Sequence, residues 1–207
     1  MPELKEKIEK AVWSANTLFT KGLSNGSTGN ISFRYNDSIY ISESGSCFGR
    51  LTESCFAIVD LDGSIISGKP SKELPLHVVL YRVNADVQCV IHTHSLYTTL
   101  FSCESNLQSK INSLFLYTPY LEILTEGKIA IVEYAEPGSE QLFKTFLQRV
   151  CKNTNVYILK NHGIVVAAKD AYKAFDFIEE FEISAKLRNK SFVYGEKEMT
   201  KIERKVK

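Results

Sequence analysis

Two of the chain's four histidines lie one residue apart, in the stretch His92-Thr93-His94, directly after an apolar run. Residues 87–93 predict a buried strand, and alternate side chains of a strand leave the same face. His92 and His94 would then stand side by side with their Cα atoms about 6.7 Å apart, which allows both imidazoles to bind one metal ion. They could equally be hydrogen-bonded histidines of the core, so the spacing alone leaves both interpretations open.

A third histidine, His162, has a similar setting. It follows the apolar run 156–159 and precedes Gly163, which allows a close approach of the backbone. With His92 and His94 it would form a set of three histidines at strand ends. Catalytic zinc commonly has three protein ligands and an exchangeable position, whereas structural zinc usually has four ligands rich in cysteine. The chain has no CxxC pair, so the pattern favours a catalytic metal site.

A carboxylate lies close to a predicted helix start. Ser71 is expected to cap a helix over residues 72–83, with Pro75 in the opening turn. Glu73 would then lie in the first turn, either as a solvated residue beside the helix dipole or as a metal ligand and general base. His77 is four residues further on and shares its helical face, where it could orient Glu73 without touching the metal.

Three short loops of small polar residues offer backbone N–H groups and hydroxyls. They are Thr28-Gly29-Asn30, Ser44-Gly45 and Ser71-Lys72. Such loops can bind a phosphate, particularly at a helix N-terminus, and Lys72 would add a positive charge. Each loop is a weak signal by itself, because similar turns occur in most proteins.

The elements that must position these residues are predicted from apolar periodicity and turn residues. Helices are expected within residues 1–24, where the apolar stripe is Ile8, Val12, Ala15, Phe19 and Leu23, and over 72–83, 95–103, 139–151 and 171–189. Strands are expected over 31–35, 38–42, 56–60, 64–67, 87–93, 128–134, 156–159 and 164–168. A long connection follows residue 103, and the charged tail 195–207 is expected to be flexible.

Composition restricts the class of protein. Lys and Arg total 25 against 24 Asp and Glu, so the net charge of +1 does not favour nucleic acid or an anionic membrane as a partner. No apolar run approaches ~20 residues and the first residues alternate in charge, so a cytoplasmic protein is expected. The five cysteines are odd in number and widely spaced, which predicts reduced thiols.

Taken in order, these motifs resemble the class II aldolase family, which includes fuculose-phosphate aldolase and ribulose-phosphate 4-epimerase. The resemblance covers about residues 5 to 190. It implies a single α/β domain, residues 1–207, with a central, mostly antiparallel or mixed β-sheet flanked by helices. It also implies a homotetramer whose active sites lie between neighbouring subunits.

The resemblance assigns roles to individual residues. It implies one zinc ion per subunit, with Glu73 as acid/base and as a ligand of the substrate-free ion. The implied zinc-binding histidines are His92, His94 and His162, and the implied phosphate-binding residues are Thr28, Asn30, Ser44, Gly45 and Ser71. Tyr120 aligns with a tyrosine that donates a proton in the aldolase, although a buried core tyrosine would satisfy the same pattern.

Within this family, the motifs are most similar to the branch of 3-oxo-tetronate 4-phosphate decarboxylases. Lys72 stands where the fuculose-phosphate aldolase pattern has a second serine, and it could meet a substrate carboxylate, pair with phosphate or remain solvated. The hypothesis is a zinc-dependent lyase that acts on a small phosphorylated keto-sugar or keto-sugar acid through a metal-stabilised enediolate. Its expected products are dihydroxyacetone phosphate and CO2.

Three alternatives remain. Retro-aldol cleavage would use the same residues. A 4-epimerase is a weaker candidate, because its additional acid/base residues find no match here. An adducin-like interaction module would lack the metal ligands, whereas this chain has all four.

Overall fold

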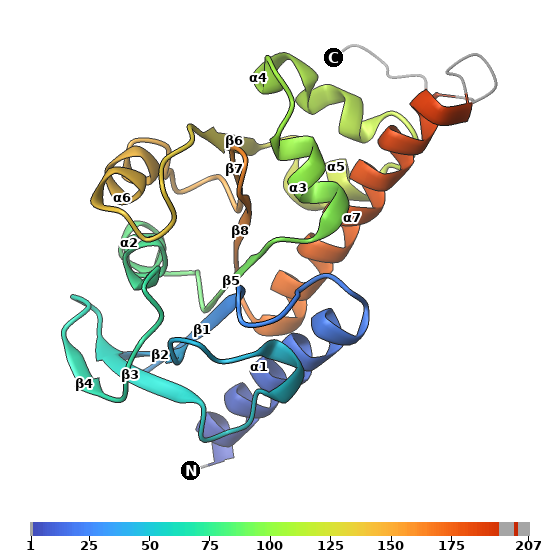
Figure 1. Ribbon diagram of the computed structural model, residues 1–207. Coiled ribbons are helices and arrows are strands. Elements are labelled where there is room, and N and C mark those ends of the chain that lie inside the picture. The colour runs from blue at the N-terminus through green and yellow to red at the C-terminus, as the bar shows by residue number, and fades with distance from the viewer. Residues whose placement is uncertain (1, 195–200, 203–207) are drawn as a thin grey trace.

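The chain folds around an eight-stranded sheet with strand order β4-β3-β2-β1-β5-β8-β7-β6, as seen in the computed structural model, which describes residues 2–194 and 201–202 (Figure 1). The strands are β1 (Asn30–Tyr35), β2 (Ser38–Ser42), β3 (Phe56–Asp60), β4 (Ile65–Ser67), β5 (Cys89–Thr93), β6 (Ile129–Val132), β7 (Val156–Leu159) and β8 (Gly163–Ala168). Only β6 and β7 pair in parallel within this described sheet. The predicted mixed, mostly antiparallel sheet is confirmed.

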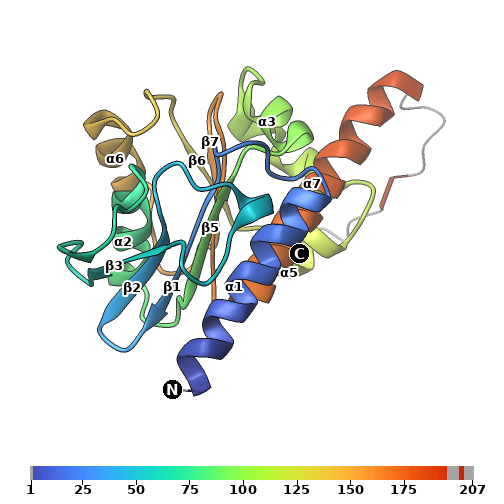
Figure 2. The same cartoon turned by 60° about the horizontal axis from the view of Figure 1, so that its bottom comes forward.

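Helices cover both faces of the sheet (Figure 1). They are α1 (Pro2–Thr20), α2 (Leu74–Val83), α3 (Leu96–Ser102), α4 (Leu107–Lys110), α5 (Tyr120–Thr125), α6 (Glu140–Leu147) and α7 (Ala171–Tyr194), with the 3-10 helices η1 (Phe48–Arg50) and η2 (Ile111–Phe115). Helices α2 and α6 lie on one face, and α1, α3, α5 and α7 lie on the other. Figure 2 shows α1 and α7 running alongside one another.

The central strand β5 is buried along its whole length and contributes to both cores. Cys89 and Ile91 belong to the core beneath α1 and α7, whereas Val90 belongs to the core beneath α2 and α6. Alternation along the strand therefore directs His92 towards the α2 side. This is the side on which Glu73 lies.

The start of α2 differs from the prediction. Ser71 does not cap the helix, which begins at Leu74 with Glu73 as its N-cap residue. Pro70 is bridged to Glu43 and the N–H of Ser71 donates to the carbonyl of Ser42, so pairing with the sheet keeps the chain extended here. The Ser71 hydroxyl instead accepts the N–H of Glu73 at 3.3 Å. Pro75 lies in the first turn as predicted.

The buried face of α1 also differs from the predicted stripe. Ala11, Ala15 and Leu18 are fully buried, whereas Phe19 is 38% exposed and lies against Gly49 of η1. The small side chains of Ala11 and Ala15 allow α1 to pack closely on its neighbours, whereas Phe19 lies at the margin of this face.

The long connection after residue 103 contains regular structure that the sequence reading missed, namely α4 and η2, and α5 follows it. These are short elements, and their apolar residues show too few turns to establish a period. Several boundaries also moved: α6 ends at Leu147 and α7 continues to Tyr194. The predicted flexible tail lies outside the described residues except for residues 201–202.

Within the part of the chain that the structure describes, no helix is both long enough and apolar enough to cross a membrane. All five cysteines are free thiols.

Glu182 of α7 caps the N-terminus of α3 directly after the His94 stretch. Its carboxylate accepts the N–H of Tyr97 at 2.9 Å, the N–H of Thr98 at 2.8 Å and the hydroxyl of Thr98 at 2.7 Å. The Glu182 side chain is buried, so these donors have little access to water. This contact holds the chain leaving β5 and thereby the backbone that carries His94.

Replacing Glu182 by Ala should lower the free energy of unfolding by about 1–3 kcal/mol, because two buried donors of Thr98 and the partly buried N–H of Tyr97 lose their acceptor. Urea unfolding measures this loss. Glu179→Ala is the matched control, since Glu179 lies on the same helix and pairs with Lys21 at the surface; it should cost less than about 1 kcal/mol. Equal losses in the two variants would contradict the capping role.

Candidate active site

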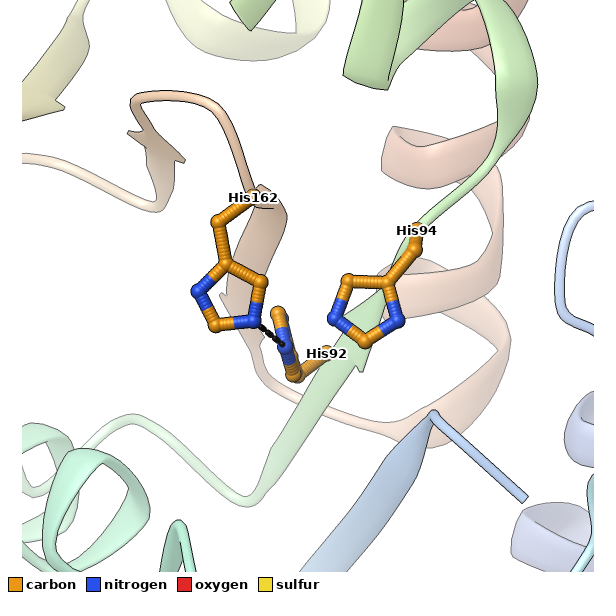
Figure 3. Close-up of side chains that lie close together, drawn as sticks. All are labelled: His92, His94 and His162. Atoms are coloured by element: carbon orange, nitrogen blue, oxygen red, sulfur yellow. Dashed lines mark hydrogen bonds between the residues drawn. The ribbon is translucent and has the colours of Figure 1, made fainter. Parts of the chain in front are cut away.

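Three strand ends meet where the histidines lie. Strands β5 and β7 run in the same direction, because both are antiparallel to β8. The carboxyl ends of β5 and β7 therefore lie at the same end of the sheet. The amino end of β1 lies there too, because β1 is antiparallel to β5. His92 lies on β5, His94 just beyond it and His162 in the turn that precedes β8 (Figure 3).

The three imidazoles converge on one point. The ring centroids of His92 and His94 are 4.4 Å apart, and each lies 4.9 Å from the ring of His162. One nitrogen from each ring lies within 4.8 Å of the other two. His92 donates its Nδ1–H to the carbonyl of Ile164 at 2.8 Å, which leaves the Nε2 lone pair directed at the group. The predicted three-histidine set is brought together.

Burial keeps these rings uncharged. Loss of solvent lowers the pKa of His92 to about 3 and that of His94 to about 3, and the neighbouring histidines add to both shifts. Burial also lowers the pKa of His162. Neutral imidazoles present the lone pairs that a metal ion needs.

Glu73 completes the cluster. Its Oε2 lies 3.2 Å from Nε2 of His92 and its Oε1 lies 3.6 Å from Nε2 of His162. Among the described residues, Glu73 Oε1 and His94 Nε2 are buried atoms with no hydrogen-bond partner. Buried polar atoms normally have partners, so three neutral imidazoles and this carboxylate fit a bound divalent metal ion.

Gly163 permits the close approach of His162 to β5. A Cβ at position 163 would lie 2.3 Å from the carbonyl oxygen of Thr93 and 2.8 Å from Cδ2 of His94. Asn161 begins this turn with a positive φ of 53°. The turn is therefore shaped so that His162 reaches the other two histidines.

A cavity of about 570 Å³ opens beside the histidines. It is lined by Ser27, Thr28, Gly29, Asn30, Glu43, Ser44, Gly45, Ser71, Lys72, Glu73, His94, Pro137, Gly138 and His162. All six residues predicted from the polar loops are in this set. The loops belong to distant parts of the sequence, so their convergence beside the histidines could not be derived from any one of them.

Sequence reasoning missed Ser27, Glu43, Pro137 and Gly138 as lining residues. Pro137 and Gly138 precede α6, whose N-cap residue Ser139 accepts the N–H of Leu142. The Pro-Gly pair signals a turn, but nothing in its spacing connects it to the histidines. Glu43 adjoins the loop Ser44-Gly45. A negatively charged side chain is not expected to line a predicted anion site, so the sequence did not point to Glu43.

Tyr120 is the one predicted site residue that lies elsewhere. It begins α5, is 60% exposed, and lines a separate cavity with Ile123, Asp176 and Glu180. Among the described residues of one chain, the structure does not bring Tyr120 to the histidine cavity.

His77 and Asn30 are linked to Glu73. Asn30 donates its Nδ2 to Oε2 of Glu73 at 3.0 Å, and its Oδ1 lies 2.6 Å from Nε2 of His77. His77 thus contacts Glu73 through Asn30 rather than directly. The β1–β5 register places Asn30 opposite His92, so both side chains lie on one face of the sheet.

Comparison with known proteins identifies the family of this chain. The model of the family described as Class II Aldolase and Adducin N-terminal domain matches residues 9–188. The chain belongs to this family. A curated relative, the 3-oxo-tetronate 4-phosphate decarboxylase of Haemophilus influenzae, is 33% identical over 189 residues, covering 90% of this chain and 88% of the relative. The L-fuculose phosphate aldolase of Methanocaldococcus jannaschii is 41% identical over 162 residues, covering 78% of this chain and 84% of that protein.

Solved structures of the family share the fold. YgbL from Escherichia coli superposes with a TM-score of 0.82 at 30% identity, covering 94% of this chain and 92% of the other. A sugar-phosphate aldolase from Thermotoga maritima superposes with a TM-score of 0.83 at 22% identity, covering 93% and 97%. This similarity confirms the predicted fold class.

Gly163→Ala should weaken binding of a divalent metal ion about 10–100-fold, because the new methyl group would displace the Thr93 backbone and the His94 ring. Competition with a chelating indicator measures the affinity for zinc, and circular dichroism checks that the variant is folded. A folded variant with unchanged affinity would show that the close approach at Gly163 is not needed.

Proposed function

We propose that this protein is a zinc-dependent lyase that decarboxylates a 3-oxo-tetronate 4-phosphate to dihydroxyacetone phosphate and CO2. The observation that carries the proposal is the cavity that joins the histidine cluster and Glu73 to three polar loops. The decarboxylases among its relatives, aligned over most of the chain, support the choice of reaction. The proposed location is the cytoplasm, in keeping with the free thiols.

Zinc is proposed because three imidazoles and a carboxylate suit this ion better than magnesium or calcium, which prefer oxygen ligands. His92, His94 and His162 would hold one ion per subunit, and Glu73 would ligate it until substrate binds. A bound zinc ion would supply Lewis-acid stabilisation of the negative charge that develops at the ketone oxygen.

The polar loops are proposed to hold the two anionic ends of the substrate. Thr28, Ser44, Gly45 and Ser71 would bind the phosphate through hydroxyls and backbone N–H groups. Lys72 is exposed at the cavity and would pair with the carboxylate in the ground state. This pair orients the carbon–carbon bond that breaks.

The reaction requires one proton for each CO2 released. The bond between the carboxyl carbon and its neighbour breaks, and its electron pair passes towards the adjacent ketone. The carbon that loses CO2 then takes up a proton, which yields the hydroxymethyl end of dihydroxyacetone phosphate. Glu73, buried beside the histidines, is the group proposed to take up that proton from solvent and deliver it to the carbon.

Retro-aldol cleavage is the second candidate. It is favoured by the relatives named L-fuculose phosphate aldolase, which are 40–42% identical to this chain over a shorter span. The same acid/base and phosphate-binding residues would serve, with an aldehyde as the leaving fragment instead of CO2.

A homotetramer with active sites between subunits is also proposed. Tyr120 and Ile123 are 60% and 66% exposed, so α5 presents an apolar surface that a neighbouring copy could cover. In such an assembly Tyr120 would reach the histidine cavity of a neighbour and assist proton transfer there.

The function is tested by supplying the zinc-loaded protein with 3-oxo-tetronate 4-phosphates and, separately, with fuculose and ribulose phosphates. The expected products are CO2 and dihydroxyacetone phosphate in equal amounts from the tetronates. If the protein instead forms an aldehyde together with dihydroxyacetone phosphate and releases no CO2, it is an aldolase and the decarboxylase proposal is wrong.

Lys72→Ser should lower kcat/KM for the tetronate about 10–100-fold, because a charge-assisted bond to the carboxylate is lost. Inhibition by dihydroxyacetone phosphate, which has no carboxylate, should change much less. Lys69→Ser is the matched control, because Lys69 is an exposed lysine of the same turn that does not line the cavity. Equal weakening of tetronate and dihydroxyacetone phosphate would mean that Lys72 binds phosphate.

A further inference from the structure

A chain of buried hydrogen bonds runs from Glu73 into the core between α2 and β1. Asn30 donates to Glu73, and Asn30 Oδ1 lies 2.6 Å from Nε2 of His77. Nδ1 of His77 lies 2.7 Å from the Ser32 hydroxyl, which lies 2.7 Å from the Tyr81 hydroxyl. All five side chains are buried.

The secondary structure explains why these residues meet. Glu73, His77 and Tyr81 are spaced four residues apart and lie along one face at the start of α2 and within it. Asn30 and Ser32 are two residues apart on β1 and point to one face of the sheet. The polar side chains on this face of α2 thus pack against those on β1, and they form hydrogen bonds with one another.

The donors and acceptors can be assigned from the carboxylate outward. An ionised Glu73 only accepts, so the Asn30 amide nitrogen faces it and the Asn30 oxygen faces His77. His77 must then carry its proton on Nε2. Burial lowers the pKa of His77 to about 3, so the ring is neutral and Nδ1 accepts from Ser32. The Tyr81 hydroxyl donates to the Ser32 hydroxyl and is the first donor in this series of hydrogen bonds.

We propose that Asn30 is a positioning residue for Glu73, oriented by His77, Ser32 and Tyr81. Both polar atoms of its side chain are engaged within the protein, and its backbone lies opposite His92 in the β1–β5 register. The carboxylate is thereby held in a constant position relative to the strand that carries His92. The role of Glu73 as acid/base rests on the proposed function, whereas the hydrogen-bond chain does not.

The first test is ¹⁵N NMR of the histidine rings in the metal-free protein. The wild type should show His77 as the neutral Nε2–H tautomer, and Asn30→Leu should shift it towards Nδ1–H because the acceptor is lost. If the wild type shows the Nδ1–H tautomer of His77, the hydrogen bonds run in the opposite direction and the proposal is wrong. This readout needs no turnover, so it stands even if no substrate above is converted.

The second test separates positioning from binding in the zinc-loaded enzyme. Asn30→Ala and His77→Leu should each lower kcat about 10–100-fold with little change in KM, and the double variant should be no worse than Asn30→Ala alone. His77→Gln, which keeps an N–H donor towards Asn30, should recover most of the activity. A raised KM with unchanged kcat in Asn30→Ala would assign Asn30 to substrate binding.

Tyr81→Phe and Tyr157→Phe provide a matched pair of buried tyrosines. The Tyr157 hydroxyl donates to the carbonyls of Cys151 and Thr154 and has no link to Glu73. Both variants should lose some thermal stability, but only Tyr81→Phe should lower kcat. Equal kcat in the two variants would remove Tyr81 from the positioning chain.

Discussion

Three imidazoles and a carboxylate lie together at the carboxyl end of the central strand, with His92 and Glu73 buried and His94 and His162 partly buried, and the surrounding structure is arranged to accommodate them. Such groups are costly to remove from water unless each finds a partner. His92 is anchored by the carbonyl of Ile164, and Glu73 is anchored by Asn30. The remaining lone pairs point towards one another, which in a protein interior is unfavourable without a cation between them. A metal ion would turn this unfavourable cluster into a satisfied one.

The fold brings the cluster together from three separate segments. Strand β5 supplies His92 and the chain leaving it supplies His94, while the turn after β7 supplies His162 because β5 and β7 run in the same direction. Helix α2 begins only after Pro70 has bridged to Glu43, which directly follows β2, and Glu73 is therefore the N-cap residue. Glu182 then restrains the exit from β5 by capping α3. Distant contacts therefore control the position of each of these side chains.

Much of the site could be predicted from the sequence, because its signals are local. Histidines that end apolar strands and a carboxylate near a helix start are visible in short stretches. What could not be predicted depends on long-range pairing. Ser71 was assigned as a helix cap because its pairing with β2 is not encoded in its neighbours. The link from His77 to Glu73 required the β1–β5 register, and the lining role of Pro137 required the packing of α6. Tyr120 shows the converse case, in which a family pattern places a residue that a single chain does not bring to the site.

The central claim is that His92, His94 and His162 bind one metal ion together. X-ray absorption at the zinc edge of the zinc-loaded protein tests it most directly, because the signal of imidazole rings is distinct from that of thiolates. Zinc held by these three residues should show three imidazole nitrogens at about 2.0–2.1 Å with the remaining ligands oxygen, and two imidazoles in His94→Ala. Sulfur at about 2.3 Å, or fewer than three imidazoles in the wild type, would contradict it.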